Sequence, residues 1–325
     1  MLTRRNAITS VGAAASVLSM PAILPARAAD LPNIRWGYIL PPVAEMAGIF
    51  LLKPELLKHH GKTYTFEPKF LRGSPLVVTA LAANEIDMGN LVFSTFHQAV
   101  VNAGISDMRI IADEAEDAFN GQFASQLRVR KDSGITKVAD LKGKVIATIA
   151  IGSGADMMTR YHLRKQGFEL NRDFTYLETP FPTMKAMLLE KKVDAAYFAQ
   201  PFASDPEVNE KTNILFTTGD SMGPFAPNFV GMRGDFIKKN RAAVVDFLED
   251  FIRMVRWYYD PANRDASIKI VAEASKTPEE VLRRYIFTKE DNFRSMDAMP
   301  DLKVIQSNMQ AQFELGFTRQ VLKVE

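Results

Sequence analysis

The sequence predicts an α/β fold made of two doubly wound lobes joined by a hinge, with a helical segment at its carboxyl end. Strand-like and helix-like segments alternate between residues 34 and 112, and the alternation repeats between residues 122 and 201. From residue 243 the apolar side chains recur at helical spacing without strands between them. A helical segment with no sheet of its own is expected to pack on the first lobe. The predicted domains are lobe 1, residues 29–115 plus 226–325, and lobe 2, residues 116–225.

The first lobe is expected to begin with a strand at 34–39 and a helix at 44–60 that Pro54 interrupts. A strand at 64–70 then leads into Arg72-Gly73-Ser74-Pro75, which we interpret as a glycine turn, a serine N-cap and a proline at the first helical position. A strand at 86–91, a helix at 94–103 and a strand at 108–112 follow. Two helix N-termini therefore lie at the carboxyl ends of neighbouring parallel strands, where open α/β sheets bind small ligands and where anions are favoured.

The second lobe repeats this architecture without a residue-level repeat. The expected strands are 122–129, 145–149, 176–177 and 194–198, and the expected helices are 135–144, 155–166 and 182–192, with another helix beginning at Gln200. The helices expected in the carboxyl-terminal segment are 243–259, 268–274, 279–287 and 302–313. The chain crosses between the lobes near 113–117 and 217–228. We interpret the acidic run 113–117 as a solvent-exposed crossover, with a cation site as the alternative.

Composition excludes several classes of function. The 325 residues contain four histidines and no cysteine, which removes thiol catalysis, disulfides, zinc-thiolate sites and iron–sulfur clusters. Gly61-Lys62-Thr63 resembles the end of a phosphate-binding loop, but Leu56 stands where that motif needs a glycine, so ATP binding is rejected. We expect no cofactor and no metal. The adjacent His59 and His60 are interpreted as solvated side chains at a helix end.

The first 28 residues carry an export signal. A basic start is followed by the uncharged stretch 6–25, and Ala26-Arg27-Ala28 offers a cleavage site near Ala28. Arg4-Arg5 resembles a twin-arginine signal but departs from it at Ala7 and Thr9, so the export route stays open. An amino-terminal membrane anchor is the alternative, although an alanine-rich run with prolines suits a spanning helix poorly.

Cleavage would leave a nearly neutral chain. It removes three arginines and no acidic residue, so that 37 basic residues remain against 38 acidic ones, a net charge of −1. This balance gives no argument for binding nucleic acid or an anionic membrane surface. There is no cysteine for lipid attachment. The expected product is a monomer, free in the periplasm and not embedded in a membrane.

Three segments in series resemble the nitrate/sulfonate/taurine-type solute-binding proteins of ABC importers. The first is Gly73-Ser74-Pro75-Leu76 with Glu85-Ile86-Asp87-Met88-Gly89, the second is 135–144 followed by Gly152-Ser153-Gly154, and the third is 188–198. Together they cover roughly residues 30–235. The resemblance implies a type II periplasmic binding protein fold, closure of two lobes on one solute, and delivery to a separate permease driven by a separate ATPase. It implies no catalytic residues.

The candidate ligand-binding residues lie at the ends of the predicted strands. They are Leu40, Pro42, Arg72, Gly73, Ser74, Val92, Phe93, Ser94, Thr95, Ser153, Gly154, Phe181 and Gln200. Leu40 and Pro42 would form an apolar wall, and Phe93 to Thr95 fall where the resembled family lines its pocket. Ser74 either contacts the ligand or only caps its helix. Arg72 either binds a carboxylate or sulfonate with its fork of N–H groups or is a solvated strand-end arginine.

The predicted ligand is a small anion with an apolar or aromatic body, because helix N-termini combine here with Phe93, Phe181 and Phe225. Two other functions remain open. One is a ligand-presenting subunit of a sensor. The other is an enzyme or binder on the same fold, such as the pyrimidine-precursor synthases among distant relatives of the resembled family. Those enzymes use a motif with cysteine and histidine, and a chain without cysteine cannot supply it.

Overall fold

The computed structural model describes residues 31–39 and 45–324, which belong to one compact unit. The predicted signal segment 1–28 and the candidate residues Leu40 and Pro42 lie outside the described residues. Among the described residues, none of the helices combines the length and the apolar character that crossing a bilayer requires.

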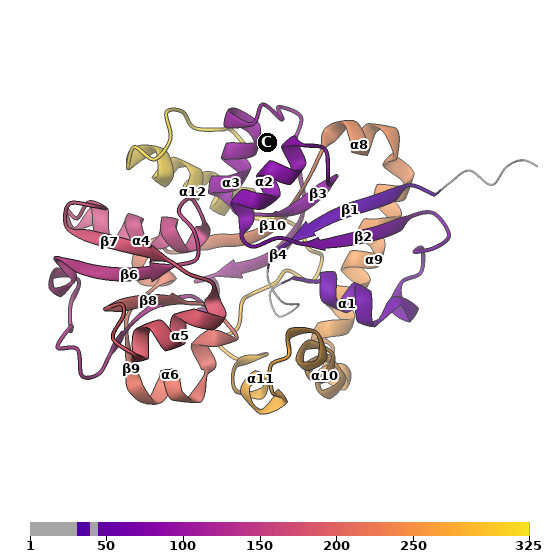
Figure 1. Cartoon of the computed structure of the whole chain (residues 1–325). Helices are drawn as coiled ribbons and strands as arrows, with labels where there is room; N and C mark the ends of the chain where they lie inside the picture. Colours follow the sequence, from indigo (N-terminus) through magenta and orange to yellow (C-terminus); the bar gives the residue numbers. More distant parts are fainter. Residues whose placement is uncertain (1–30, 40–44, 325) are drawn as a thin grey trace, which may run out of the picture. The chain divides into compact units, whose positions relative to one another are not determined.

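The first sheet has the strand order β2-β1-β3-β10-β4 (Figure 1). Its strands are β1 (Asn33–Tyr38), β2 (Thr65–Phe70), β3 (Met88–Leu91), β4 (Arg109–Asp117) and β10 (Phe225–Met232). The first three run parallel, as predicted, but β10 lies between β3 and β4 and is antiparallel to both. The four predicted strands β1 to β4 thus run in one direction, but β10, a strand that follows the second lobe and was not predicted, separates β3 from β4.

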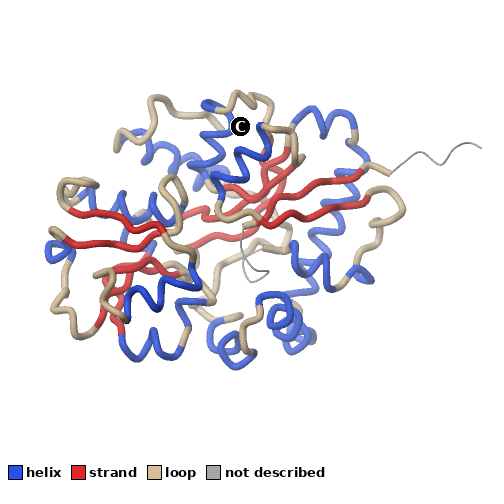
Figure 2. Tube along the Cα trace, in the orientation of Figure 1, coloured by secondary structure: helices blue, strands red, loops and turns tan. Residues whose placement is uncertain are grey.

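The second sheet is built entirely from the middle of the chain, in the order β7-β6-β8-β5-β9. Its strands are β5 (Gln126–Arg130), β6 (Lys144–Thr148), β7 (Phe174–Glu178), β8 (Ala195–Phe198) and β9 (Thr212–Thr217). Strand β5 is antiparallel to both of its neighbours, whereas β6, β7 and β8 run parallel. Two sheets, each flanked by helices, confirm the predicted α/β class (Figure 2). The exact division of the chain into lobes remains our proposal.

Helices cover both faces of the first sheet (Figure 1). One face carries α1 (Ala47–Leu52), α9 (Arg241–Tyr259), α10 (Arg264–Ser275) and α11 (Glu279–Tyr285), and α8 (Gly234–Lys239) precedes α9. The other face carries α2 (Ser74–Ala82), α3 (Phe93–His97), the π-helical turn Gln98–Asn102 and α12 (Leu302–Glu314).

The helices of the second lobe are shorter on average. They are α4 (Gly154–Lys165), α5 (Phe181–Leu189), α6 (Pro206–Lys211) and α7 (Thr218–Ser221). Short 3₁₀ turns lie at Pro54–Leu56, Val138–Leu141, Phe202–Ser204 and Pro261–Asn263. The helix predicted at 135–144 is thus reduced to a single turn, followed by Gly143 with φ of 75°.

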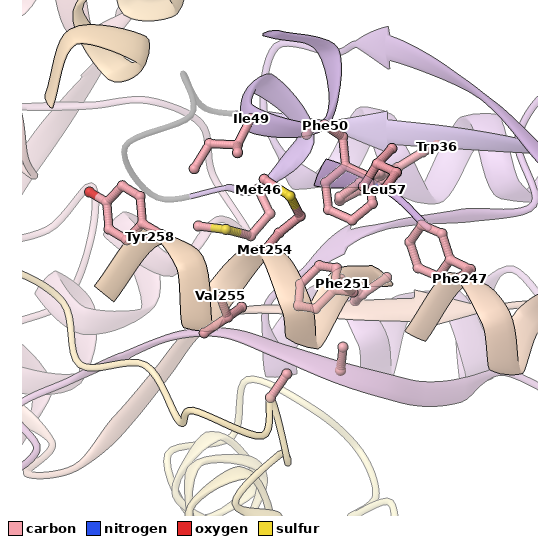
Figure 3. Close-up of a cluster of buried hydrophobic side chains, with 14 of the residues drawn as sticks. Trp36, Met46, Ile49, Phe50, Leu57, Phe247, Phe251, Met254, Val255 and Tyr258 are labelled. Atoms are coloured by element: carbon pink, nitrogen blue, oxygen red, sulfur yellow. The ribbon is translucent and has the colours of Figure 1, made fainter. Parts of the chain in front are cut away.

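The predicted packing of the carboxyl-terminal helices on the first lobe is confirmed. Helix α10 contacts α1, and α12 contacts α3 and β10. The segment also reaches the second lobe, because α11 contacts the turn Phe202–Ser204 and α12 contacts α4. Its attachment to the first lobe is apolar: Phe247 and Phe251 of α9 pack with Trp36 of β1 and Phe50 of α1 (Figure 3).

The acidic run 113–117 is not a solvent-exposed crossover, so that interpretation is wrong. It forms the end of β4, and its four carboxylates are buried. Asp117 accepts hydrogen bonds from the backbone N–H groups of Ala118 at 2.8 Å, Ala124 at 2.8 Å and Ser125 at 3.0 Å. This carboxylate therefore fixes the loop that leads from β4 into the second lobe, and backbone donors compensate part of its desolvation.

A close approach of α2 to the sheet depends on Gly89. A Cβ atom built on this residue would lie 2.3 Å from Cγ1 of Val77. We expect Gly89→Ala to lower the free energy of unfolding by about 1–3 kcal/mol, because overpacking forces the helix from the sheet. Urea titration measures this change. The cost should shrink in a Val77→Ala background, and an equal cost in both backgrounds would contradict the explanation.

Candidate functional site

A cavity of about 230 Å³ is lined by residues from both lobes. The first lobe contributes Ile39, Phe70, Arg72, Gly73, Ser74, Val92, Ala115, Pro227, Asn228 and Asn292. Phe225, which the predicted division counts with lobe 2, begins β10 of the first sheet and also lines the cavity. The second lobe contributes Ser125, Ile149, Ser153, Gly154, Ala155, Pro180, Phe181, Pro182, Tyr197, Ala199, Gln200 and Phe202. The walls are mainly apolar, with a few polar groups, which is the usual composition of a small-molecule site.

Eight of the candidate residues line this cavity. They are Arg72, Gly73, Ser74, Val92, Ser153, Gly154, Phe181 and Gln200. The other described candidates, Phe93, Ser94 and Thr95, are buried and are not among the lining residues. Whether any of the eight contacts a ligand stays a prediction.

The start of α2 differs from the predicted N-cap. Gly73 is the N-cap, with φ of 102°, and Ser74 is the first helical residue. A positive φ of this size is accessible to glycine and strained for other residues, which explains why the turn needs Gly73. The Ser74 hydroxyl has no hydrogen-bond partner among the described residues, so the alternative that Ser74 only caps its helix is wrong. Pro75 has no N–H, and the N–H of Leu76 donates to the carbonyl oxygen of Gly73 at 3.1 Å. The hydroxyl and the N–H of Ser74 therefore remain for a ligand.

Arg72 is the one charged residue among the described residues that line the cavity. Its side chain is exposed, and no carboxylate of the described residues lies within ion-pair distance of it. A guanidinium beside an apolar cavity and a helix N-terminus offers up to five N–H donors to an anion.

In the turn before α4, which contains the candidate residues Ser153 and Gly154, other groups of the protein already use several of the hydrogen-bond donors. The Ser153 hydroxyl donates to the carbonyl oxygen of Ala150 at 2.6 Å and caps α4 by accepting from the N–H of Asp156. The carboxylate of Asp156 accepts from the N–H of Gly152 at 2.7 Å. The turn thus holds a carboxylate of its own. Among the described residues, the N–H groups of Gly154 and Ala155 at the start of α4 have no acceptor.

The residues after Val92 form a second layer behind the wall. Phe93 packs edge-on against Phe225, with 5.5 Å between the ring centroids, and Phe225 rather than Phe93 lines the cavity. The Ser94 hydroxyl donates to the carbonyl oxygen of Gly152 at 2.9 Å and links the two lobes. Thr95 bonds the backbone of Val92 at the start of α3. These side chains position the wall instead of facing the cavity.

A buried polar network holds Asn228 of β10 in the cavity wall. Its amide oxygen accepts from Nδ2 of Asn90 at 3.1 Å, and its amide nitrogen donates to Glu45 at 3.2 Å. Asn90 also accepts from Nε1 of Trp36 at 2.6 Å. Glu114 accepts from the N–H of Met46, and burial raises the pKa of this carboxyl to about 8. Because its amide is engaged, Asn228 is a fixed part of the wall.

Several lining residues were not predicted from the sequence. Phe70, Phe202 and Tyr197 lie in or after strands whose ends were recognised, so a complete survey of strand ends would have found them. Asn292 has no such signal. It lies between α11 and α12, about 180 residues beyond the first lobe's β4 in sequence, and no motif marks it.

A group of ionisable residues far from the cavity is a set of ion pairs. His59 contacts Asp246 and Glu249, whose ligand atoms lie within 4.8 Å of one another. Glu249 also pairs with Lys58 at 3.3 Å and Arg253 at 3.1 Å. Two neighbouring cations oppose the binding of a metal ion. His59 is half-buried against these acids and not simply solvated as predicted.

Residues 28–272 match the model of the NMT1-like family. Among solved structures, the chain is similar to the alkanesulfonate-binding protein SsuA from Xanthomonas axonopodis pv. citri bound to MOPS, with a TM-score of 0.70 and 22% identity over 91% of this chain and 98% of that one. It is also similar to the periplasmic nitrate-binding protein NrtA from Synechocystis PCC 6803, with a TM-score of 0.67 and 18% identity over 89% of this chain and 83% of that one. The periplasmic aliphatic sulphonate binding protein SsuA from Escherichia coli has a TM-score of 0.65 and 20% identity over 90% of this chain and 90% of that one. No curated protein matches the chain.

Proposed function

The chain belongs to the NMT1-like family, and from this premise we propose that it is the substrate-binding component of an ABC transporter. In this proposal the protein captures a small organic anion, a carboxylate or sulfonate, between its lobes in the periplasm. It then delivers the solute unchanged to a membrane permease served by a separate ATPase. The proposed ligand contacts are the eight candidate residues that line the cavity.

The observation that carries the proposal is a cavity with one cationic side chain and mainly apolar walls. Arg72 and the N-terminus of α2 attract an anion, and no described residue neutralises Arg72. Phe181 and Phe202 are stacked, with 5.4 Å between ring centroids and an interplanar angle of 9°, and both line the cavity. Such walls suit an apolar or aromatic body. They favour an organic acid over nitrate, because nitrate would leave most of the apolar surface uncovered.

The similar structures support the proposal at the level of fold. Two of them are named as sulfonate-binding proteins and one as a nitrate-binding protein. In a fold of two lobes, a ligand that contacts both lobes selects the closed form, so binding itself supplies the signal for delivery. This mechanism needs no catalytic group.

Isothermal titration calorimetry against carboxylates, sulfonates and nitrate tests the proposal. We expect one organic acid to bind with a stoichiometry of one. In Arg72→Gln its dissociation constant should rise about tenfold to a hundredfold, because a charge-assisted hydrogen bond contributes roughly 1.5–3 kcal/mol. Lys69→Gln is the matched control, because Lys69 lies on β2 outside the cavity lining. Absence of heat with every anion, together with binding of a cation or a neutral pyrimidine, would refute the proposal.

A further inference from the structure

The cavity has two chemically different ends. Strand β2 is one edge of the first sheet and β4 is the other, so that Arg72, which follows β2, and Ala115, within β4, lie at opposite ends of the first-lobe wall. In the second sheet β7 is one edge strand, and β5, which follows the crossing from β4, lies beside the other edge strand, β9. The ring of Phe181 lies near Tyr197 of β8 and stacks on Phe202, so it marks neither end. We call the two ends the edge end and the hinge end. Arg72 therefore places the anion-binding group at the edge end.

Gln200 provides a polar group that no other residue satisfies. Its side chain is 3% exposed, and neither its amide oxygen nor its amide nitrogen has a hydrogen-bond partner among the described residues. The antiparallel register pairs Gln126 with Phe198. Gln200 therefore follows β8 where β8 lies beside the start of β5, and β5 follows the crossing, in which the N–H of Ala124 donates to Asp117 at 2.8 Å. Gln200 thus belongs to the hinge end.

Asn292 adds a second amide at the same end. It lies in the segment 286–301 that connects α11 to α12. This segment is bound to the crossing: Phe123 donates to the carbonyl oxygen of Lys289 at 2.8 Å, and Phe293 exchanges backbone hydrogen bonds with Glu116 at 2.8 and 2.9 Å. Asn292 lines the cavity and is 7% exposed, and no described residue bonds its side-chain amide.

We propose that the ligand carries, at the end remote from its acid group, an uncharged group that both donates and accepts hydrogen bonds, such as a carboxamide, and that Gln200 and Asn292 select it. This inference rests on the proposed function and specifies its substrate class. Buried amides left unpaired by an apolar ligand keep their desolvation cost, so the site discriminates against a plain alkyl tail. The same asymmetry makes sites built for hydrogen bonds reject apolar isosteres strongly.

The test compares 4-carbamoylbenzoate with 4-isopropylbenzoate, two acids of similar shape, by calorimetry. The wild-type protein should bind the carbamoyl compound at least about tenfold more tightly. Gln200→Leu and Asn292→Leu should each remove most of this preference while still binding the isopropyl compound, which shows that the variants fold. Gln166→Leu, an exposed position at the end of α4, should keep the preference.

Equal affinity for the two compounds, or tighter binding of the isopropyl compound, would overturn this inference and leave the proposed function standing. A preference that survives both leucine variants would also overturn it. Absence of heat with both compounds overturns it as well, and the wider panel of acids then decides separately whether the protein binds anions.

Discussion

Replacement of Phe247 by alanine is expected to lower the free energy of unfolding by about 3–5 kcal/mol, the usual cost of truncating a buried phenylalanine. Phe247 is fully buried and lies near Trp36 and Phe50 (Figure 3). Its ring centroid is 5.9 Å from that of Trp36, 5.7 Å from that of Phe50 and 5.7 Å from that of Tyr64. Helix α9 belongs to the last third of the chain and these partners belong to the first third. The substitution therefore weakens the packing that holds the carboxyl-terminal helices on the first lobe.

Urea titration followed by circular dichroism measures this effect. Phe313→Ala is the matched control, since Phe313 is 40% exposed on α12 and its removal should cost less than about 0.5 kcal/mol. Equal effects of the two substitutions would show that the aromatic cluster does not hold the carboxyl-terminal helices to the sheet.

The stability of the protein is expected to fall as the pH rises from about 5 to about 8. Burial raises the pKa of Glu114 from its ordinary 4.5 to about 8, and burial with the nearby Asp301 raises the pKa of Glu116 to about 7. The folded state then binds more protons than the unfolded state between these values. The free energy of unfolding is therefore larger at low pH, and it falls by up to about 1.4 kcal/mol per pH unit for each such group as the pH rises.

Glu114→Gln tests this prediction, because glutamine resembles the protonated carboxyl in shape and cannot ionise. Between pH 5.5 and pH 8 the free energy of unfolding should fall less in the variant than in the wild type. The fall that remains is the part caused by Glu116. Thermal unfolding at several pH values measures the difference, with the exposed Glu280→Gln as control. A wild-type stability that is flat over this range, or an unchanged slope in Glu114→Gln, would contradict the assignment of a buried protonated carboxyl.

The fold class could be predicted because its signals are local. Alternation of apolar residues located β1 and β8 closely, and the helical period from residue 243 onward located α9 to within two residues at its start. The position of β10 could not be predicted in this way. Its insertion between β3 and β4 joins segments more than 100 residues apart, and no periodicity within a single segment reports which strand lies beside it.

The acidic run shows how burial can reverse a reading from composition. A run of charged residues ordinarily indicates a solvent-exposed segment. Here the backbone N–H groups of Ala118, Ala124 and Ser125 stabilise the buried carboxylate of Asp117 inside the crossing. Those donors lie in a loop whose conformation depends on the fold. The same dependence explains why Asn292 was not predicted: it reaches the cavity because its segment pairs with the end of β4 in the folded protein. Ser74 and Gln200 were predicted because each follows the end of a strand that the sequence reveals.

The crystal structure of the protein with the tightest-binding acid of the panel tests the central claim most directly. We expect the intact ligand inside the cavity, with its acid group within about 3 Å of the Arg72 guanidinium and of the Ser74 hydroxyl. A ligand bound outside the cavity, an acid group that faces away from Arg72, or a chemically altered product in the site would contradict the account.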